Sequence, residues 1–168
     1  MGYVHDTAMS LYVPPNAMNF VTGTWADAAG QVAGTIVKIK TAGAETTTIN
    51  VPLFVPSNSV ALKGSKIASI EIDYEIRTAA ATSVTLAVNK VTRGADTAVA
   101  VVAAVTGTQT LTPATTAATV DQHRDKFTIT TPAYIDNDEY YLLKVTAVCA
   151  AGTVLEILGA TINYTARM

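Results

Sequence analysis

IEIDYEI, at residues 70–76, carries the clearest strand signal in the chain. Its even-numbered positions hold isoleucine or tyrosine, and its odd-numbered positions hold glutamate or aspartate. This period of two places the apolar side chains on one face of a β-strand and the acidic side chains on the other. The stretch therefore predicts a strand with one buried face and one exposed face.

Strand signals continue on both sides of this stretch. From alternation or β-branched composition we predict further strands at residues 36–40, 45–55, 83–91, 127–131, 140–149 and 153–166. Pro52 cannot donate to a neighbouring strand, so the strand at 45–55 is an edge strand or a bulged one. The last strand keeps its apolar residues in phase only if it bulges near Gly159. Residues 94–107 mix alanine with valine, and we favour a strand there because helix capping is poor, with a loop at 108–119.

About eight strands and no clear helix predict an all-β fold. A jelly roll or a related antiparallel β-sandwich, in which the alternating faces of two sheets pack together, is the expected architecture. An immunoglobulin-like sandwich is the alternative, although its paired cysteines are missing. We assign residues 19–168 to one domain and residues 1–18 to an extended N-terminal arm, because Pro14 and Pro15 exclude a helix there. The apolar residues of the arm must lie on this chain or on a neighbour.

The composition favours association. Charged residues make up 14% of the 168 residues and hydrophobic residues 49%, against about 25% charged residues in an average soluble domain. Such a surface has little charge to keep copies apart, so we expect neighbours to cover part of it. A monomer coated with threonine is the alternative. The net charge of −2 and the scattered lysines and arginines predict no nucleic-acid partner.

Neither a membrane nor a catalytic role is indicated. No apolar stretch approaches the roughly 20 residues of a membrane span, and the N-terminus lacks the pattern of a signal peptide. The residues best suited to catalysis are His5, His123 and Cys149, and no motif of a hydrolase, metalloprotease, redox site or phosphate loop occurs. His5 lies in the arm, a poor place for preorganised chemistry. We predict no enzymatic activity, no cofactor and a buried structural thiol at Cys149.

Two polar clusters offer ligands for a cation. Asp121, His123 and Asp125 would share one face of an extended segment, and carboxylate and imidazole suit several metals. Residues 136–139, DNDE, offer oxygen ligands for calcium. We favour the simpler interpretations, a solvated strand start and a turn in which Asp and Asn bond the local backbone. No metal site is therefore predicted.

The acidic face of residues 70–76 is a candidate contact surface. Glu71, Asp73 and Glu75 point the same way, and we expect no basic neighbour beside them. Three carboxylates on one strand repel each other, so they would meet a basic partner or face water. They do not converge on a cleft, as the paired carboxylates of a glycosidase do.

Three longer stretches resemble a group of tailed-phage virion proteins. They are VPLFVPSNSVALKGSKIASIEIDYEI at 51–76, VDQHRDKFTITTPAYIDNDEYYLLKVT at 120–146 and LEILGATINYTARM at 155–168. The resemblance implies a small decoration or cement protein that resembles a jelly roll, often forms trimers and lies on the outer capsid surface. Its partners would be the major capsid protein and other copies of itself, after synthesis in the host cytoplasm.

The arm and the aromatic residues lead to two further expectations. If the resemblance holds, Leu11, Tyr12 and Val13 of the arm are predicted contacts to neighbouring subunits. The alternative function is a carbohydrate- or receptor-binding β-sandwich module of a phage tail. That function would require a platform of aromatic side chains on one exposed face.

Overall fold

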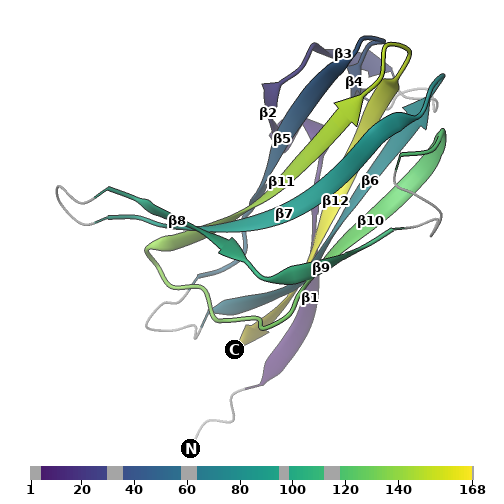
Figure 1. The fold of residues 1–168 in the computed structure, drawn as a ribbon. Coiled ribbons are helices and arrows are strands. Elements are labelled where there is room, and N and C mark those ends of the chain that lie inside the picture. The colour runs from purple at the N-terminus through teal and green to yellow at the C-terminus, as the bar shows by residue number, and fades with distance from the viewer. Residues whose placement is uncertain (1–4, 30–35, 58–63, 95–98, 112–117, 168) are drawn as a thin grey trace, which may run out of the picture.

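Two antiparallel β-sheets pack face to face in the computed structural model, which describes residues 5–29, 36–57, 64–94, 99–111 and 118–167 (Figure 1). The seven-stranded sheet runs in the order β3 (Trp25–Ala29), β4 (Ile36–Lys40), β12 (Val154–Arg167), β6 (Ser65–Arg77), β10 (Asp121–Ile129) and β9 (Gly107–Thr110), and β1 (Asp6–Val13) also pairs with β12. The five-stranded sheet runs in the order β2 (Asn19–Thr22), β5 (Glu45–Leu53), β11 (Glu139–Cys149), β7 (Ala81–Thr92) and β8 (Val101–Val105). One 3-10 turn, η1 (Pro15–Ala17), joins β1 to β2. The prediction of an all-β sandwich is confirmed.

The order of the strands from β4 onward is that of a jelly roll. Counted from β4, with β8 and β9 taken as one segment, the first, eighth, third and sixth strands (β4, β12, β6, β10) are neighbours in one sheet. The second, seventh, fourth and fifth strands (β5, β11, β7, β8) are neighbours in the other. Two nested Greek keys produce this order.

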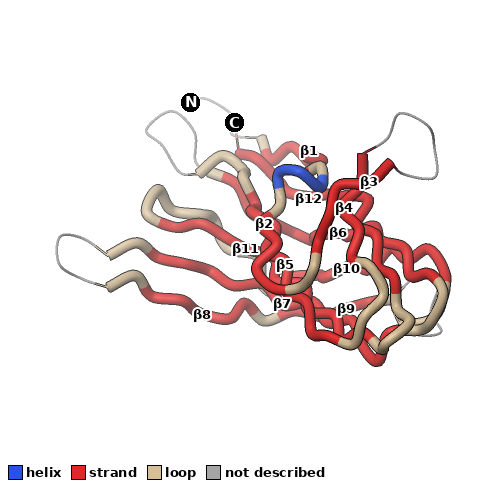
Figure 2. Tube along the Cα trace, turned by 90° about the horizontal axis from the view of Figure 1, so that it is seen from above, coloured by secondary structure: helices blue, strands red, loops and turns tan. Residues whose placement is uncertain are grey.

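Two segments cross from one sheet to the other at opposite sides of the sandwich. Residues 101–110 form β8 in the five-stranded sheet and then β9 in the seven-stranded sheet. Residues 19–29 form β2 and β3 in the same way, and they turn at Gly23, whose φ of +105° is a conformation that favours glycine. Figure 2 shows these crossing segments from above. Such strand switches form the corners of a sandwich.

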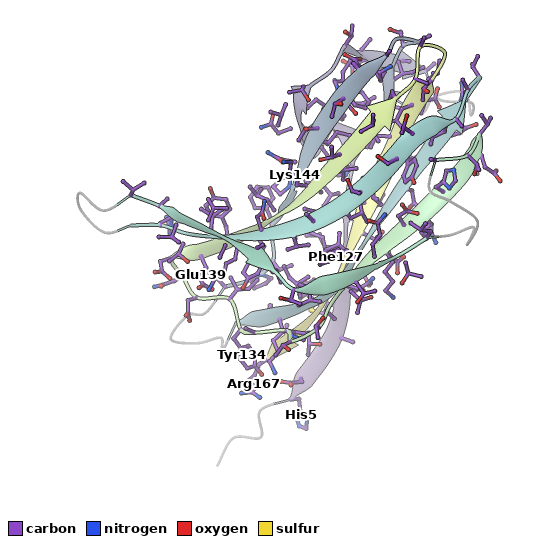
Figure 3. All side chains as sticks on the ribbon, in the orientation of Figure 1. His5, Phe127, Tyr134, Glu139, Lys144 and Arg167 are labelled. Atoms are coloured by element: carbon purple, nitrogen blue, oxygen red, sulfur yellow. The ribbon has the colours of Figure 1, made fainter. Side chains whose placement is uncertain are left out.

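The core lies between the sheets and is formed by the alternating positions expected from the sequence. Ile70, Ile72, Tyr74 and Ile76 of β6 are each at most 1% exposed. They belong to one cluster of buried apolar residues with inward positions of β5, β10 and β11, among them Phe127 (Figure 3). Each fully buried aliphatic side chain contributes roughly 1.5–3 kcal/mol to folding. The predicted strand around residues 70–76 is therefore the centre of the seven-stranded sheet.

Several expected boundaries differ from the structure because polar side chains hide strands. β10 begins at Asp121 rather than at residue 127, since its first inward positions are His123 and Asp125 instead of apolar residues. β9 lies at the start of the expected 108–119 loop, of which residues 112–117 lie outside the described residues. The expected strand within 94–107 is found at Val101–Val105, and residues 95–98 are also outside the described residues.

The sequence predicted irregularities at two positions, near Gly159 and at Pro52. The register of β12 against β6 shifts between Ile157 and Gly159, so the predicted bulge is confirmed. Pro52 lies in β5 opposite Leu142 of β11. On its other side β5 pairs with β2 at residues 48–50 and not at Pro52, so the proline occupies a part of the strand with an open edge.

The N-terminal arm is extended, and it lies on its own chain. β1 pairs with β12 from Asp6 opposite Arg167 to Val13 opposite Ala160. Side chains add to the backbone pairing: Ser10 Oγ donates to Asn163 Oδ1 at 2.7 Å, and Arg167 Nε donates to Asp6 Oδ1 at 3.1 Å. Of the two placements left open by the sequence, the structure has the arm folded back on its own domain.

Candidate interaction surface

The outer face of the seven-stranded sheet is a ladder of ion pairs. Arg124 of β10 donates to both carboxylate oxygens of Asp73 at 2.6 and 3.2 Å, and Lys126 lies 3.5 Å from Glu71. Arg77 lies 3.3 Å from Glu75 and 2.6 Å from Glu156 of β12. Glu156 is 1% exposed, and its burial raises the pKa of its carboxyl group against the opposing effect of Arg77.

The expectation of an acidic stripe without basic neighbours was wrong. The pairing of β10 with β6 places Arg124 opposite Asp73 and Lys126 opposite Glu71. Both bases were visible in the sequence, but strand order decides which carboxylates they meet, and one sequence does not give strand order. Contact of Glu71, Asp73 and Glu75 with a partner remains a prediction, and such a partner would compete with these intrachain pairs.

The outer face of the five-stranded sheet is nearly free of charge. The strand registers align its outward residues in five rows across β5, β11, β7 and β8. The rows are Thr46–Val148–Ser83, Thr48–Thr146–Thr85, Asn50–Lys144–Ala87, Pro52–Leu142–Asn89–Ala104 and Tyr140–Val91–Val102. Within these rows Lys144 is the one charged residue (Figure 3). We call this surface the uncharged face.

One end of the uncharged face is apolar. In its last row Tyr140 is 44% exposed and Val102 is 62% exposed, and they flank Val91, which is 5% exposed. Phe54 follows β5 directly and is 72% exposed. Large apolar side chains that gather on one surface, beside a face with few charges, are typical of a protein interaction site.

β8 continues this apolar end as an open strand edge. β8 pairs with β7 on one side, and no described strand pairs with its other side. The β7–β8 hairpin extends away from the sandwich in both Figure 1 and Figure 2. Val99, just before β8, is 86% exposed, and Val101 is 63% exposed.

The three predicted arm contacts differ in how exposed their side chains are. Val13 is 5% exposed and belongs to the buried core, so its side chain is not available to a partner and that part of the prediction was wrong. Leu11 and Tyr12 are 37% and 56% exposed. They remain predicted contact residues. The sequence of the arm does not show this difference, because it depends on the pairing of β1 with β12, which places Val13 beside Ala160 of the core.

The residues considered for a metal form a buried network instead. Asp125 is 0% exposed and accepts hydrogen bonds from the Tyr74 hydroxyl at 2.9 Å and from Gln109 Nε2 at 3.2 Å. His123 is 3% exposed, stacks on Tyr74 at 5.0 Å between ring centroids, and places Nε2 2.9 Å from the Thr119 carbonyl. Asp121 is exposed. Among the described residues no group of three His, Cys, Asp or Glu residues could hold a metal ion.

The DNDE segment is hydrogen-bonded to the residues at the end of β7. Arg93 Nη2 donates to the Asn137 carbonyl at 2.6 Å, and the Arg93 amide donates to the Asp138 carbonyl at 2.8 Å. Glu139 accepts from Lys90 Nζ at 2.6 Å (Figure 3 labels Glu139). The segment thus positions the start of β11, including Tyr140, against the base of the β7–β8 hairpin.

Sequence reasoning did not identify the exposed Phe54, Tyr140 and Val102 as parts of this surface, nor the buried Val91 between the last two. One signal was present: around Pro52 to Phe54 and around Tyr140 to Leu142, apolar residues occupy consecutive positions instead of alternate ones. The core of a two-sheet sandwich covers one face of each strand. A strand with apolar residues on both faces therefore has one apolar face outside that core.

No protein-family model matches the chain, and no curated protein matches it. No helix in the described part of the chain has the length and apolar character needed to cross a membrane.

Proposed function

We propose that this protein is a non-enzymatic structural protein of a tailed-phage particle that decorates and stabilises the capsid. It would lie on the outer capsid surface and contact the major capsid protein and other copies of itself. The observation that carries this proposal is the uncharged face with its apolar end. The resemblance of residues 51–76 and 120–146 to tailed-phage virion proteins supports the choice of a phage capsid as the partner.

The physical basis of binding is burial of the apolar end. Phe54, Tyr140 and Val102 together present aromatic and aliphatic surface to water. Burial of apolar surface contributes about 25 cal/mol per Å², before the costs of association are subtracted. Because Lys144 is the one charged residue in the rows of this face, few ionised groups need to be dehydrated in the contact. Aromatic residues and few charges are the composition of interface centres.

The test compares two single charges placed on opposite outer faces. Tyr140→Asp puts a carboxylate in the apolar end, whereas Thr128→Asp puts one on an exposed position of β10 in the seven-stranded sheet. We expect Tyr140→Asp to weaken binding to undecorated capsids by roughly tenfold or more and Thr128→Asp to have little effect. Circular dichroism would establish that both variants fold. Wild-type protein that does not bind capsids, or Tyr140→Asp protein that binds as tightly as wild type, would overturn the proposal.

The copy number is tested separately. The resemblance implies a trimer, and light scattering after size exclusion measures the mass directly. A mass of three chains supports the threefold assembly, and a monomer at all concentrations contradicts self-association in solution.

The exposed aromatic side chains favour one alternative, a carbohydrate- or receptor-binding module of a phage tail. Phe54 and Tyr140 both lie at the apolar end, and sugars stack on exposed aromatic rings. Binding of the wild-type protein to a glycan array, with loss of that binding in Tyr140→Asp, would support the alternative over decoration.

A further inference from the structure

The open edge of β8 has the chemistry of a strand-pairing site. An unpaired strand edge presents backbone N–H and C=O groups that another strand satisfies in full. Folded proteins usually protect such an edge with a charge, a proline, a bulge or a very short strand. β8, with the sequence VVAAV, has no charge and no proline, and its pairing with β7 runs in unbroken register.

The other open edges are protected in these ways. β2 and β9 have four residues each, and β2 has a register shift against β5. β3 carries Asp27, and β1 begins at Asp6. β8 therefore differs from the other described edge strands by combining a regular register with an uncharged sequence.

The sequence of β8 is complementary to itself. Antiparallel pairing of two β8 strands about Ala103 uses all five residues and places Val101 opposite Val105 and Val102 opposite Ala104 of the second copy. No like charges meet in this arrangement, whereas a charged partner strand would find no opposite charge on β8. The hairpin extends away from the sandwich in both views (Figures 1 and 2).

We propose that the open edge of β8 pairs antiparallel with the β8 edge of a second copy, centred on Ala103, and joins the two five-stranded sheets. The two uncharged faces then become one continuous face, and the rows that end in Val102 and Ala104 meet across the contact. This contact deepens the self-association in the proposed function. It is twofold, so it forms dimers or links preformed trimers.

A cysteine at the twofold axis tests the pairing. In this register residue 103 faces itself, and opposite residues in antiparallel strands have Cα atoms about 4.5–5.5 Å apart, which a disulfide can span. Ala103→Cys should form a disulfide-linked dimer under mild oxidation roughly tenfold or more faster than Ala87→Cys. Ala87 is the control, because it is also an exposed alanine of the five-stranded sheet but lies on β7, which is not an edge strand. Equal rates for the two variants would overturn the proposal.

A charge exchange at the same position gives a second readout. Ala103→Lys and Ala103→Asp should each weaken edge pairing by roughly tenfold or more, because like charges would meet at the axis. An equimolar mixture of the two variants should associate again, as measured by light scattering. A mixture that stays as dissociated as each variant alone would overturn the pairing at Ala103. Capsid binding, measured separately, decides the proposed function independently of this contact.

Discussion

The ring of Tyr12 lies directly over Gly159. Its hydroxyl donates to the carbonyl of Leu158 at 2.8 Å. Gly159 has a φ of +155°, at the point where β12 bulges, and a Cβ there would lie inside van der Waals contact with the Tyr12 ring. Burial together with nearby Asp73 raises the pKa of the Tyr12 hydroxyl. The bulge predicted from the sequence thus creates the site at which the N-terminal arm docks.

We predict that Gly159→Ala destabilises the protein and loosens β1. The added methyl group meets Tyr12 and the backbone conformation becomes strained, for an expected loss of about 1–3 kcal/mol in the free energy of unfolding. Urea unfolding measures that loss, and limited proteolysis of residues 6–13 measures the loosening. Gly43→Ala is the matched control, because nothing lies within 4 Å of a Cβ at residue 43. Equal stability of the two variants would contradict this account of the bulge.

Lys40 should be a large contributor to stability despite its charge. It is 0% exposed, and its ammonium group donates to the carbonyls of Thr41, Gly43 and Thr153 at 2.8, 2.7 and 3.2 Å. Lys40→Met leaves these buried acceptors without a donor, and we expect a loss of about 2–4 kcal/mol on chemical denaturation.

Lys38→Met is the control for Lys40. Lys38 is partly exposed, and its ion partner Asp27 is largely exposed, so its removal should change the free energy of unfolding by less than about 1 kcal/mol. A Lys40→Met variant no less stable than Lys38→Met would show that the carbonyl cage is not needed.

Tyr74 should make the fold sensitive to alkali. Burial, and then the neighbouring carboxylate of Asp125, raise the pKa of Tyr74 far above its ordinary value. A group with a raised pKa in the folded state stabilises the fold fully below its unfolded pKa, about 10 for tyrosine. The stability is lost as the pH rises above that value, by about 1.4 kcal/mol per pH unit. Tyr74→Phe should lose about 1–2 kcal/mol at pH 7 with its hydrogen bond to Asp125, yet decline less steeply above pH 10. An unchanged alkaline slope in this variant would contradict the assignment.

The alternation of apolar residues was sufficient to predict the central strands. Ile70 to Ile76 and the inward positions of β5 and β11 are buried as expected, because hydrophobic burial and the pleat of a strand both have a direct trace in the sequence. β10 was found only in part, because its first inward positions are polar: Asp125 accepts hydrogen bonds from Tyr74 and Gln109, and His123 stacks on Tyr74. Local sequence carries no record of these partners, which lie on other strands.

The candidate surface was harder to predict than the core. Tyr140 and Val102 are 38 residues apart in the chain. They become neighbours of Val91 only through the pairing of β11, β7 and β8. The same holds for Arg124 and Asp73 on the opposite face. The expectation from low overall charge, that neighbours cover part of the surface, stays a prediction. The position of the uncharged face depends on strand order, which a single sequence does not contain.

Cys149 should be unreactive in the native protein. Its thiol is buried at 4% exposure, and burial raises its pKa. Reaction with a thiol reagent at pH 8 requires both exposure and the thiolate form, so we expect it to be about 100-fold slower or more in native protein than in urea. The unfolded protein is the control in the same assay. Rapid reaction of the native protein would contradict burial of the thiol, and would also require Cys149 to be replaced before the Ala103→Cys experiment.

The exposed ion pairs between β6 and β10 should contribute little to stability or binding. Arg124 is 63% exposed in its side chain and Asp73 is 21% exposed, so water and salt screen their attraction. A double-mutant cycle of Asp73→Asn and Arg124→Gln should give a coupling energy of about 0.2–1 kcal/mol.

The triple variant Glu71→Gln, Asp73→Asn, Glu75→Gln should bind capsids within about twofold of wild type, because these carboxylates already have cationic partners in the chain. A tenfold loss, together with wild-type binding that weakens steeply with salt, would instead mean that a basic partner displaces Arg124 and Lys126. The contact surface would then lie on the seven-stranded sheet, opposite the uncharged face.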